Sequence, residues 1–212
     1  MTVISSDVET VKKQLRKQML SVRDAMLPEE RAKKSNCIAE RFLRSELYQN
    51  CDRIFCYVSF RSEVDTIKLI MHMISAGKKV AVPRVDGKNM HFYEITGLLD
   101  CREGQFGILE PIEGLEEAVP DCILNSENSD NKSSDTGSNI ATNRDLMIVP
   151  GSAFTLQRDR IGYGGGYYDR FLANYPLKTI GFFFDCQKAD VIPCNQYDKK
   201  LSYILTETVF LS

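Results

Sequence analysis

Hydrophobic residues recur at helical spacing near the start of the chain. Apolar side chains return every three or four residues from position 8 to position 26, which predicts an amphipathic helix over 6–26 with one apolar stripe: Val8, Val11, Leu15, Met19, Val22 and Met26. Ser6 and Glu9 have the spacing of a capping box at its start. A second helix is predicted from Pro28, a favourable first-turn residue, to about Tyr48.

Beyond residue 50, short apolar runs alternate with helical patterns. Runs at 53–58, 79–83, 90–95, 146–149, 179–184 and 203–206 predict strands, and residues 66–76 predict a helix that ends at Gly77. Strands separated by helices are typical of an α/β fold with a mostly parallel sheet flanked by helices. We therefore expect a Rossmann-like three-layer domain with two N-terminal helices, in which ligands bind beyond the carboxyl ends of the strands.

The length of 212 residues suits a single domain, 1–212, with a substantial core. Residues 125–143 interrupt the pattern, because 125–139 consist almost wholly of Ser, Asn, Asp and other polar residues. Such a composition cannot offset its ordering entropy by burying apolar surface. We expect a disordered surface insert there.

Composition narrows the classes of partner. The formal net charge of −2 gives no bulk attraction to nucleic acid, and no apolar stretch approaches the ~20 residues of a membrane span. The seven cysteines include no Cys-x-x-Cys pair and resemble reduced thiols of an intracellular protein. His72 and His91 lack the spacing of zinc ligands. We expect a cytoplasmic monomer, although the sequence does not separate the cytoplasm from the mitochondrion.

The segment from Arg160 to Arg170 carries the strongest chemical signal. It contains four glycines among three tyrosines and an aspartate, between an apolar strand and the predicted start of a helix. Glycine lets backbone N–H groups approach a ligand, and the start of a helix favours an anion. This context indicates phosphate binding, although the glycine spacing matches neither a P-loop nor a dinucleotide fingerprint. A glycine-rich surface turn whose tyrosines pack in the core is the alternative.

Two cations lie on the same face of the first predicted helix. Lys12 and Arg16 are four residues apart and therefore share a face, where like charges repel slightly. An anion between them would remove the repulsion. A solvated basic face is the alternative.

Short motifs along nearly the whole chain occur in a specific order. They are Lys12-x-x-Leu-Arg16, Ser62-Glu63-Val-Asp-Thr66, Val82-Pro83-Arg84, Gly107-Ile-x-Glu-Pro111, Val149-Pro-Gly-x-Ala-Phe154, Arg160-x-Gly-x-Gly-Gly-Gly-Tyr-Tyr-Asp169, Asp198 and Thr206-Glu207. Together they resemble the 5-formyltetrahydrofolate cyclo-ligase family. The resemblance implies ATP-driven cyclisation of 5-formyltetrahydrofolate to 5,10-methenyltetrahydrofolate, with ADP and phosphate released and Mg²⁺ as cofactor.

The resemblance also implies roles for individual residues. For ATP they are Lys12, Arg16, Arg160, Ile161, Gly162, Tyr163, Gly164, Gly165, Gly166, Tyr167 and Tyr168. For the folate they are Val58, Glu63, Tyr163, Gly164, Gly165, Gly166 and Tyr167. Catalysis would involve Lys12, Arg160 and Tyr167, and the metal would be held by Asp169 and Asp198.

Two positions depart from the family pattern. Thr155 stands where the family usually has an aspartate, and Arg158 stands where it usually has a glycine. Asp159 is a candidate to supply the missing carboxylate from a shifted position. Because Thr155 carries no charge, a folate- or nucleotide-binding protein with impaired catalysis is one alternative. A separate alternative is a sugar-phosphate isomerase on a similar fold, which would need an acid/base pair and no ATP.

Overall fold

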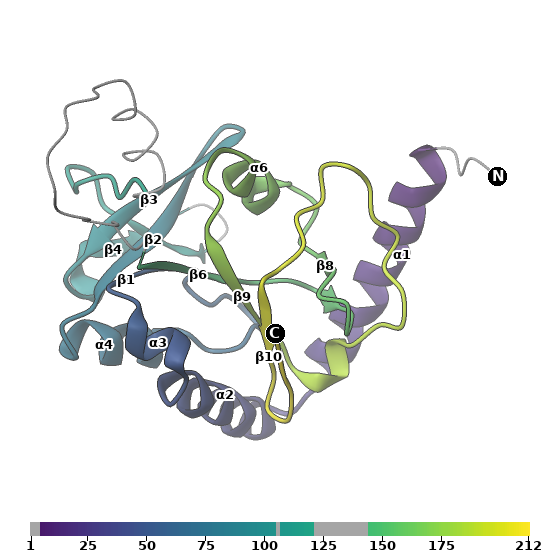
Figure 1. The fold of residues 1–212 in the computed structure, drawn as a ribbon, viewed down its shortest axis with the longest axis horizontal. Coiled ribbons are helices and arrows are strands. Elements are labelled where there is room, and N and C mark those ends of the chain that lie inside the picture. The colour runs from purple at the N-terminus through teal and green to yellow at the C-terminus, as the bar shows by residue number, and fades with distance from the viewer. Residues whose placement is uncertain (1–4, 105–106, 121–143) are drawn as a thin grey trace, which may run out of the picture.

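In the part of the chain that the structure describes, a central sheet of seven strands organises the fold (Figure 1). The computed structural model describes residues 5–104, 107–120 and 144–212. The strand order is β11-β10-β9-β6-β1-β2-β3, with bounds β1 Arg53–Cys56, β2 Lys79–Asp86, β3 Asn89–Ile95, β6 Asp145–Val149, β9 Lys178–Phe182, β10 Tyr203–Leu205 and β11 Phe210–Leu211. The inner strands pair in parallel, and only β3 and β11, at the two edges, pair antiparallel. The predicted mostly parallel sheet is confirmed.

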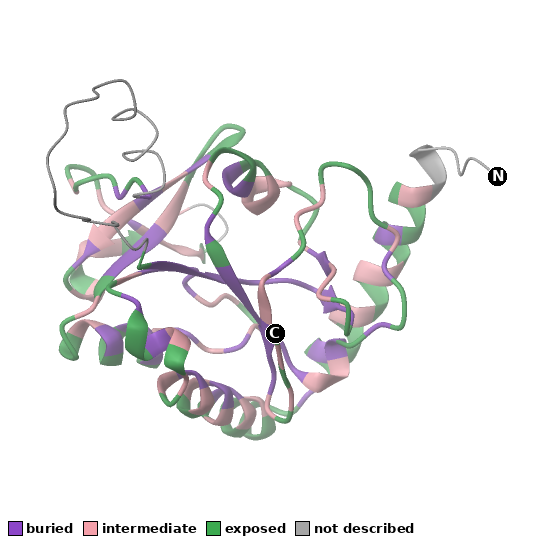
Figure 2. Ribbon diagram, viewed as in Figure 1, coloured by how far each residue is buried: buried purple, intermediate pink, exposed green. Residues whose placement is uncertain are grey.

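Alternation of side chains along the strands produces three layers. Ile54 and Cys56 of β1 point into one core and Phe55 points into another. Helices α2 (Pro28–Leu43), α3 (Glu46–Asn50) and α4 (Ile67–Ser75) cover the first face, and α6 (Tyr167–Asn174) covers the second (Figure 1). Figure 2 shows the central strands as the most continuously buried part of the fold. The expected three-layer α/β architecture is therefore present.

Helix α1 (Ser5–Asp24) uses its predicted apolar stripe only in part, since Leu15 and Met19 pack inward and Met26, just after the helix, is buried. Val11 and Val22 are exposed at 47% and 45%, whereas Lys12 and Arg23 are buried at 5% and 4%. The helix packs against the short hairpin of β7 (Ala153–Phe154) and β8 (Arg160–Ile161) and against η4 (Asp185–Gln187). These loops offer carbonyl and carboxylate oxygens, so the cationic face of α1 turns inward. The side chain of Ser6, and with it the predicted capping box, lies outside the described residues.

Other boundaries differ where the local signal was short. The second helix ends at Leu43, because the Ser45 side chain accepts a hydrogen bond from the Tyr48 amide and so caps the separate helix α3. The hairpin of β4 (Cys101–Glu103) and β5 (Leu109–Pro111) and the β7–β8 hairpin were not predicted, because strands of two or three residues carry no periodicity. The insert predicted at 125–143 lies outside the described residues, which resume at Arg144, just before β6.

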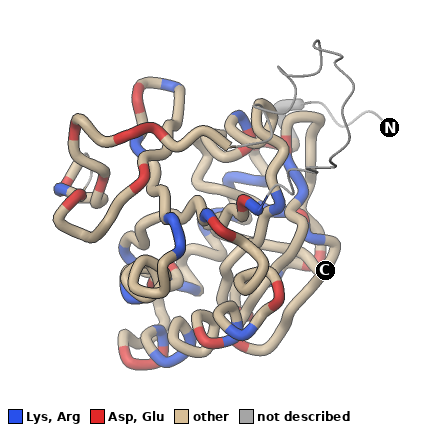
Figure 3. The backbone as a smooth tube through the Cα atoms, turned by 60° about the vertical axis from the view of Figure 1, so that its left-hand side comes forward, with Lys and Arg blue, Asp and Glu red and all other residues tan. Residues whose placement is uncertain are grey.

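Two segments leave the sheet at the same edge. Strands β1 and β6 are parallel neighbours with Cys56 opposite Ile148, so residues 57–63 and 150–166 both begin at their carboxyl ends. This is the edge where ligands bind in sheets of this kind. Among the described residues, none of the helices combines the length and the apolar character that a membrane span requires. Basic and acidic residues are interspersed along the chain (Figure 3).

Candidate active site

One cavity of about 510 Å³ lies between α1, the glycine loop and the 195–199 loop. Its walls are formed by Glu9, Lys12, Arg16, Pro150, Arg160 to Arg170, Ala173 and Asn195 to Lys199. Every residue that the resemblance assigned to ATP lines this cavity, and so do Asp169 and Asp198. The fold thus gathers side chains from three distant segments; their roles toward a ligand stay predictions.

The glycine loop takes a shape that larger residues would disfavour. Gly164 has φ +98° and Gly166 has φ +65°, in the left-handed region that favours glycine. A Cβ on Gly165 would lie 2.5 Å from the ring of Tyr167. Gly166 is the N-cap of α6, so the positive end of that helix adjoins the cavity. The loop therefore presents backbone and helix dipole to an anion.

Tyr167 is oriented by the β2–β3 hairpin. Its hydroxyl donates to the Gly87 carbonyl at 3.2 Å, and the Arg170 guanidinium lies 5.0 Å from its ring centroid. Its ring lines the cavity, but its hydroxyl is engaged elsewhere. A binding role for the ring fits this geometry more directly than a catalytic role for the hydroxyl.

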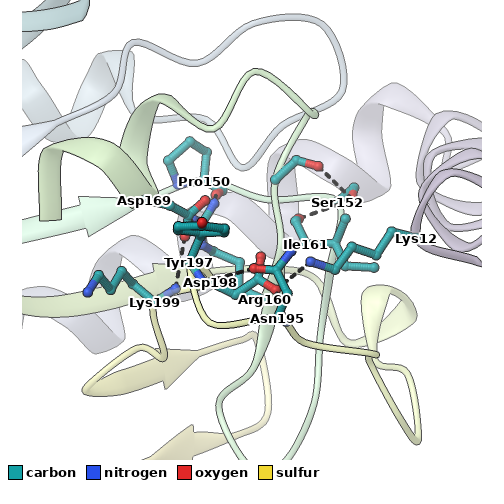
Figure 4. Close-up of polar contacts among 11 residues, drawn as sticks. Lys12, Pro150, Ser152, Arg160, Ile161, Asp169, Asn195, Tyr197, Asp198 and Lys199 are labelled. Atoms are coloured by element: carbon teal, nitrogen blue, oxygen red, sulfur yellow. Dashed lines mark hydrogen bonds and ion pairs between the residues drawn. The ribbon is translucent and has the colours of Figure 1, made fainter. Parts of the chain in front are cut away.

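The cations and carboxylates of the cavity pair with one another (Figure 4). The Lys12 ammonium contacts Asp198, whose Oδ2 also accepts from the Asn195 amide at 2.6 Å. The Arg160 guanidinium donates to Asp169 Oδ1 at 2.9 Å, and the Lys199 amide donates to the same oxygen at 3.1 Å. The 195–199 loop thus ties both carboxylates to one wall.

Two cations retain capacity for a ligand. Arg160 is 6% exposed, and its Nε is a buried donor without a partner among the described residues. Arg16 donates from Nε to the Gly162 carbonyl at 2.8 Å, while its Nη2 lies 3.8 Å from Glu9. A buried donor without a partner carries a desolvation cost that a bound phosphate oxygen would remove.

The two aspartates fit a cation that arrives with phosphate. Both hydrogen bonds to Asp169 use Oδ1 and both contacts to Asp198 use Oδ2, which leaves one oxygen of each carboxylate without a partner in the described part of the chain. The described residues contain no cluster of three or more His, Cys, Asp or Glu ligands. Mg²⁺ commonly takes one or two carboxylates and completes its shell with phosphate oxygens and water.

Val58 and Glu63 of the predicted folate set do not line this cavity. Val58 is buried in the core at 5% exposure. Burial raises the pKa of Glu63, while a hydrogen bond from Tyr163, one from the Phe60 amide at 2.8 Å, and the charge of Arg23 oppose the rise. Tyr163 lines the cavity and contacts Glu63, so it joins the two regions. The folate roles of Val58 and Glu63 stay predictions.

Sequence reasoning missed Arg23. Its guanidinium donates to Ser62 Oγ at 2.9 Å and to the Tyr163 hydroxyl at 2.7 Å. A signal existed, because Arg23 follows Arg16 by seven residues and therefore shares the helical face of Lys12 and Arg16. The 195–199 loop, apart from Asp198, was missed because it has neither periodicity nor a motif.

The two departures from the family pattern lie in the turn between β7 and β8. Thr155 is buried, and its hydroxyl both donates to Asp159 Oδ2 at 3.1 Å and accepts from the Asp159 amide at 3.2 Å. Arg158 has φ +70°, a conformation that glycine adopts more easily. None of the three lines the cavity. Asp159 therefore closes the turn and does not replace a cavity carboxylate.

Comparisons with known proteins agree on one family. The model of the 5-formyltetrahydrofolate cyclo-ligase family matches residues 8–207. The chain is 26% identical to 5-formyltetrahydrofolate cyclo-ligase of Escherichia coli strain K12 over 190 residues, covering 87% of this chain and 93% of that one. It is 27% identical to the mouse (Mus musculus) enzyme of the same name over 214 residues, covering 94% and 95%. Aquifex aeolicus 5,10-methenyltetrahydrofolate synthetase superposes with a TM-score of 0.77 at 26% identity, covering 95% and 92%.

Proposed function

The chain belongs to the 5-formyltetrahydrofolate cyclo-ligase family, and we propose from this membership that it converts 5-formyltetrahydrofolate to 5,10-methenyltetrahydrofolate at the expense of ATP. Phosphoryl transfer from ATP to the formyl oxygen makes that oxygen a leaving group. N10 of the folate then attacks the formyl carbon, a C–N bond closes the ring, phosphate leaves with the oxygen, and N10 loses its proton to solvent. ADP and phosphate are the other products.

The observation that carries the proposal is the composition of the cavity between α1, the glycine loop and the 195–199 loop. It combines Lys12, Arg16 and Arg160 with a glycine loop at the start of α6. Phosphoryl transfer needs positioning and stabilisation of charge more than covalent chemistry by the protein. Preorganised cations and backbone donors supply both. The proposed mechanism uses no nucleophilic side chain of the protein, which is consistent with a cavity whose notable features are cations and a glycine loop.

The side chains have separable tasks in this scheme. Arg160 is held by Asp169 and by the Pro150 carbonyl at 3.3 Å, so its Nε, which has no partner among the described residues, is fixed in direction. We assign it to the transferring phosphoryl group. Lys12 and Arg16 lie on α1 and hold the outer phosphates, and the ring of Tyr167 bounds the nucleotide against the β2–β3 hairpin.

We propose that Asp169 and Asp198 hold the Mg²⁺ that accompanies ATP. The ion would neutralise phosphate charge, as is usual for nucleotide sites. The test is Mg²⁺-dependent binding of ADP to the parent, D169N and D198N, measured by calorimetry. We expect the Mg²⁺ dependence to weaken in both variants, with D159N as the matched control. Parent-like Mg²⁺ titrations in D169N and D198N would place the ion elsewhere.

The alternative of a binding protein with impaired catalysis rested on Thr155. Its turn lies outside the cavity lining, so the substitution removes no charge from the cavity walls. The isomerase alternative lacks support, because the family match covers nearly the whole chain. We therefore favour the cyclo-ligase reaction.

The reaction is tested with purified protein, 5-formyltetrahydrofolate, ATP and Mg²⁺. We expect the absorbance of the methenyl product to appear at a rate proportional to protein concentration, only when ATP is present, with one ADP formed per product. The inactive control is R160M, and Arg44→Met is the matched control for loss of an exposed arginine. Product formation without ATP, or ATP consumption without product, would refute the assignment.

We further propose that the protein is a cytoplasmic monomer. Light scattering tests the oligomeric state, and cell fractionation tests the location.

A further inference from the structure

Arg23 is a buried cation that the proposed reaction does not use. It is 4% exposed and does not line the cavity. Its guanidinium donates from Nε to Ser62 Oγ at 2.9 Å and from Nη1 to Tyr163 at 2.7 Å, with a longer contact of 3.5 Å to the Gly151 carbonyl. Ser62 in turn donates to Asp24. Burying a guanidinium is costly without partners, so this site is built to keep the charge in place.

The direction of the hydrogen bonds defines a relay. A guanidinium can only donate, so the Tyr163 hydroxyl accepts from Arg23. The single proton of that hydroxyl stays available for a second acceptor, and interaction with Tyr163 lowers the pKa of the Glu63 carboxyl. The other oxygen contact of Glu63 comes from the Phe60 amide to Oε2 at 2.8 Å. Glu63 is therefore oriented from two sides, and one of them leads back to Arg23.

We propose that Arg23 is a positioning residue for the folate: through Tyr163 it holds Glu63 as an oriented anion that accepts hydrogen bonds from adjacent N–H groups of the substrate's amino-heterocycle. This inference rests on the proposed function. It assigns to the buried end of α1 a task distinct from that of Lys12 and Arg16, which face the phosphates. Because Tyr163 also lines the nucleotide cavity, the relay spans both halves of the site.

The surroundings of Glu63 explain why a cation is required. Tyr57, Tyr163 and Tyr168 also lie near the carboxylate, and burial raises the pKa of each of them, so they are neutral at pH 7. Desolvation opposes the charged form of Glu63 as well. Arg23 is the cation whose charge opposes that effect in the described part of the chain. Without it, the pKa of Glu63 rises further.

The sign of the pH effect follows. The carboxylate accepts hydrogen bonds from substrate N–H groups only when it is ionised. If Arg23 is removed, Glu63 takes up a proton at a higher pH than in the parent. As the solution is acidified, the variant without Arg23 should therefore lose folate affinity at a higher pH than the parent does.

The experiment compares R23M, R23K and Y163F with the parent. We expect R23M to raise KM for 5-formyltetrahydrofolate by roughly tenfold to a hundredfold, the range expected when charge-assisted hydrogen bonds are lost. The acid limb of kcat/KM for the folate should move to higher pH, while KM for ATP changes by less than about threefold. R23K keeps the charge, so its acid limb should stay near that of the parent. Y163F cuts the relay and should raise KM for the folate with Arg23 in place.

The controls separate positioning from folding. Lys17→Met removes an exposed cation from the same helix and should leave both KM values unchanged. Active-site titration corrects each rate for the folded fraction. A folate KM and a pH profile of R23M that match those of the parent would overturn the relay. If R23M does not fold, a parent-like folate KM in both R23K and Y163F would overturn it. Absence of turnover in the parent would refute the proposed function alone, because the equilibrium Kd for 5-formyltetrahydrofolate tests the relay without turnover.

Discussion

The ion pair between Lys12 and Asp198 should stabilise the ligand-free protein, and this effect can be separated from nucleotide binding. The predicted apolar stripe of the first helix implied that Lys12 could be replaced without affecting folding. The structure reverses that expectation, since the two side chains are only 6% and 22% exposed and joined across 186 positions of the chain. We therefore consider K12M, D198N and the double variant.

The loss of unfolding free energy on breaking this ion pair lies between two known limits. Exposed ion pairs contribute up to about 1 kcal/mol, and loss of one partner of a fully buried pair costs about 3–5 kcal/mol. Because the Asp198 side chain retains 22% of its exposure, we expect each single variant to lose about 2 kcal/mol of unfolding free energy. In a chain of this length that corresponds to a fall in Tm of about 4–8 °C. The double variant removes both charges and should recover at least ~1 kcal/mol relative to the sum of the single losses.

Urea unfolding measures the stabilities, and calorimetry with Mg·ADP measures binding. K13M, which removes an exposed neighbour on the same helix, should stay within about 0.5 kcal/mol of the parent. The double variant should bind ADP at least about tenfold more weakly than the parent even though its stability recovers, because a cation for phosphate is gone. Strictly additive stability losses, within about 0.5 kcal/mol, would show that Lys12 and Asp198 are not paired, and the reasoning would fail.

Three further predictions follow from local geometry. At Arg158, with φ +70°, both R158A and R158G lose the side-chain contact with the Ser202 carbonyl, but only glycine adopts the left-handed backbone without strain. In urea unfolding, R158G should therefore be about 1 kcal/mol more stable than R158A, and equal stabilities would contradict this. At Gly164, with φ +98° and Arg16 beside its would-be Cβ at 3.4 Å, G164A should weaken ADP binding more than about tenfold at a stability cost of about 1–2 kcal/mol, whereas a variant that is destabilised yet binds ADP normally would favour a purely structural turn. Replacing residues 126–139 by a short Gly/Ser linker should leave stability within about 1 kcal/mol and cyclisation intact, since closure entropy changes by only ~0.6 kcal/mol per doubling of length; a more than tenfold loss of kcat/KM would show that the segment takes part in catalysis.

Sequence patterns determined the fold class and most of the cavity lining. Buried strands such as 146–149 read as apolar runs, and helices such as 66–76 read as helical periodicity, because each pattern reflects the layer in which the element is buried. The glycine loop and the pair of cations on the first helix were also local signals. Each of these two signals identified one wall of the cavity, but neither indicated that the two walls contact each other.

The tertiary structure alone decided which surfaces meet. Periodicity reports that a helix has an apolar stripe, but the partner surface decides which face is buried. For α1 that partner is a hairpin and loops more than 100 positions away, rich in carbonyl and carboxylate oxygens, so Lys12 and Arg23 turned inward and Val11 and Val22 remained exposed. No local pattern encodes such long-range complementarity of charge, because it depends on how distant segments are brought together by the sheet.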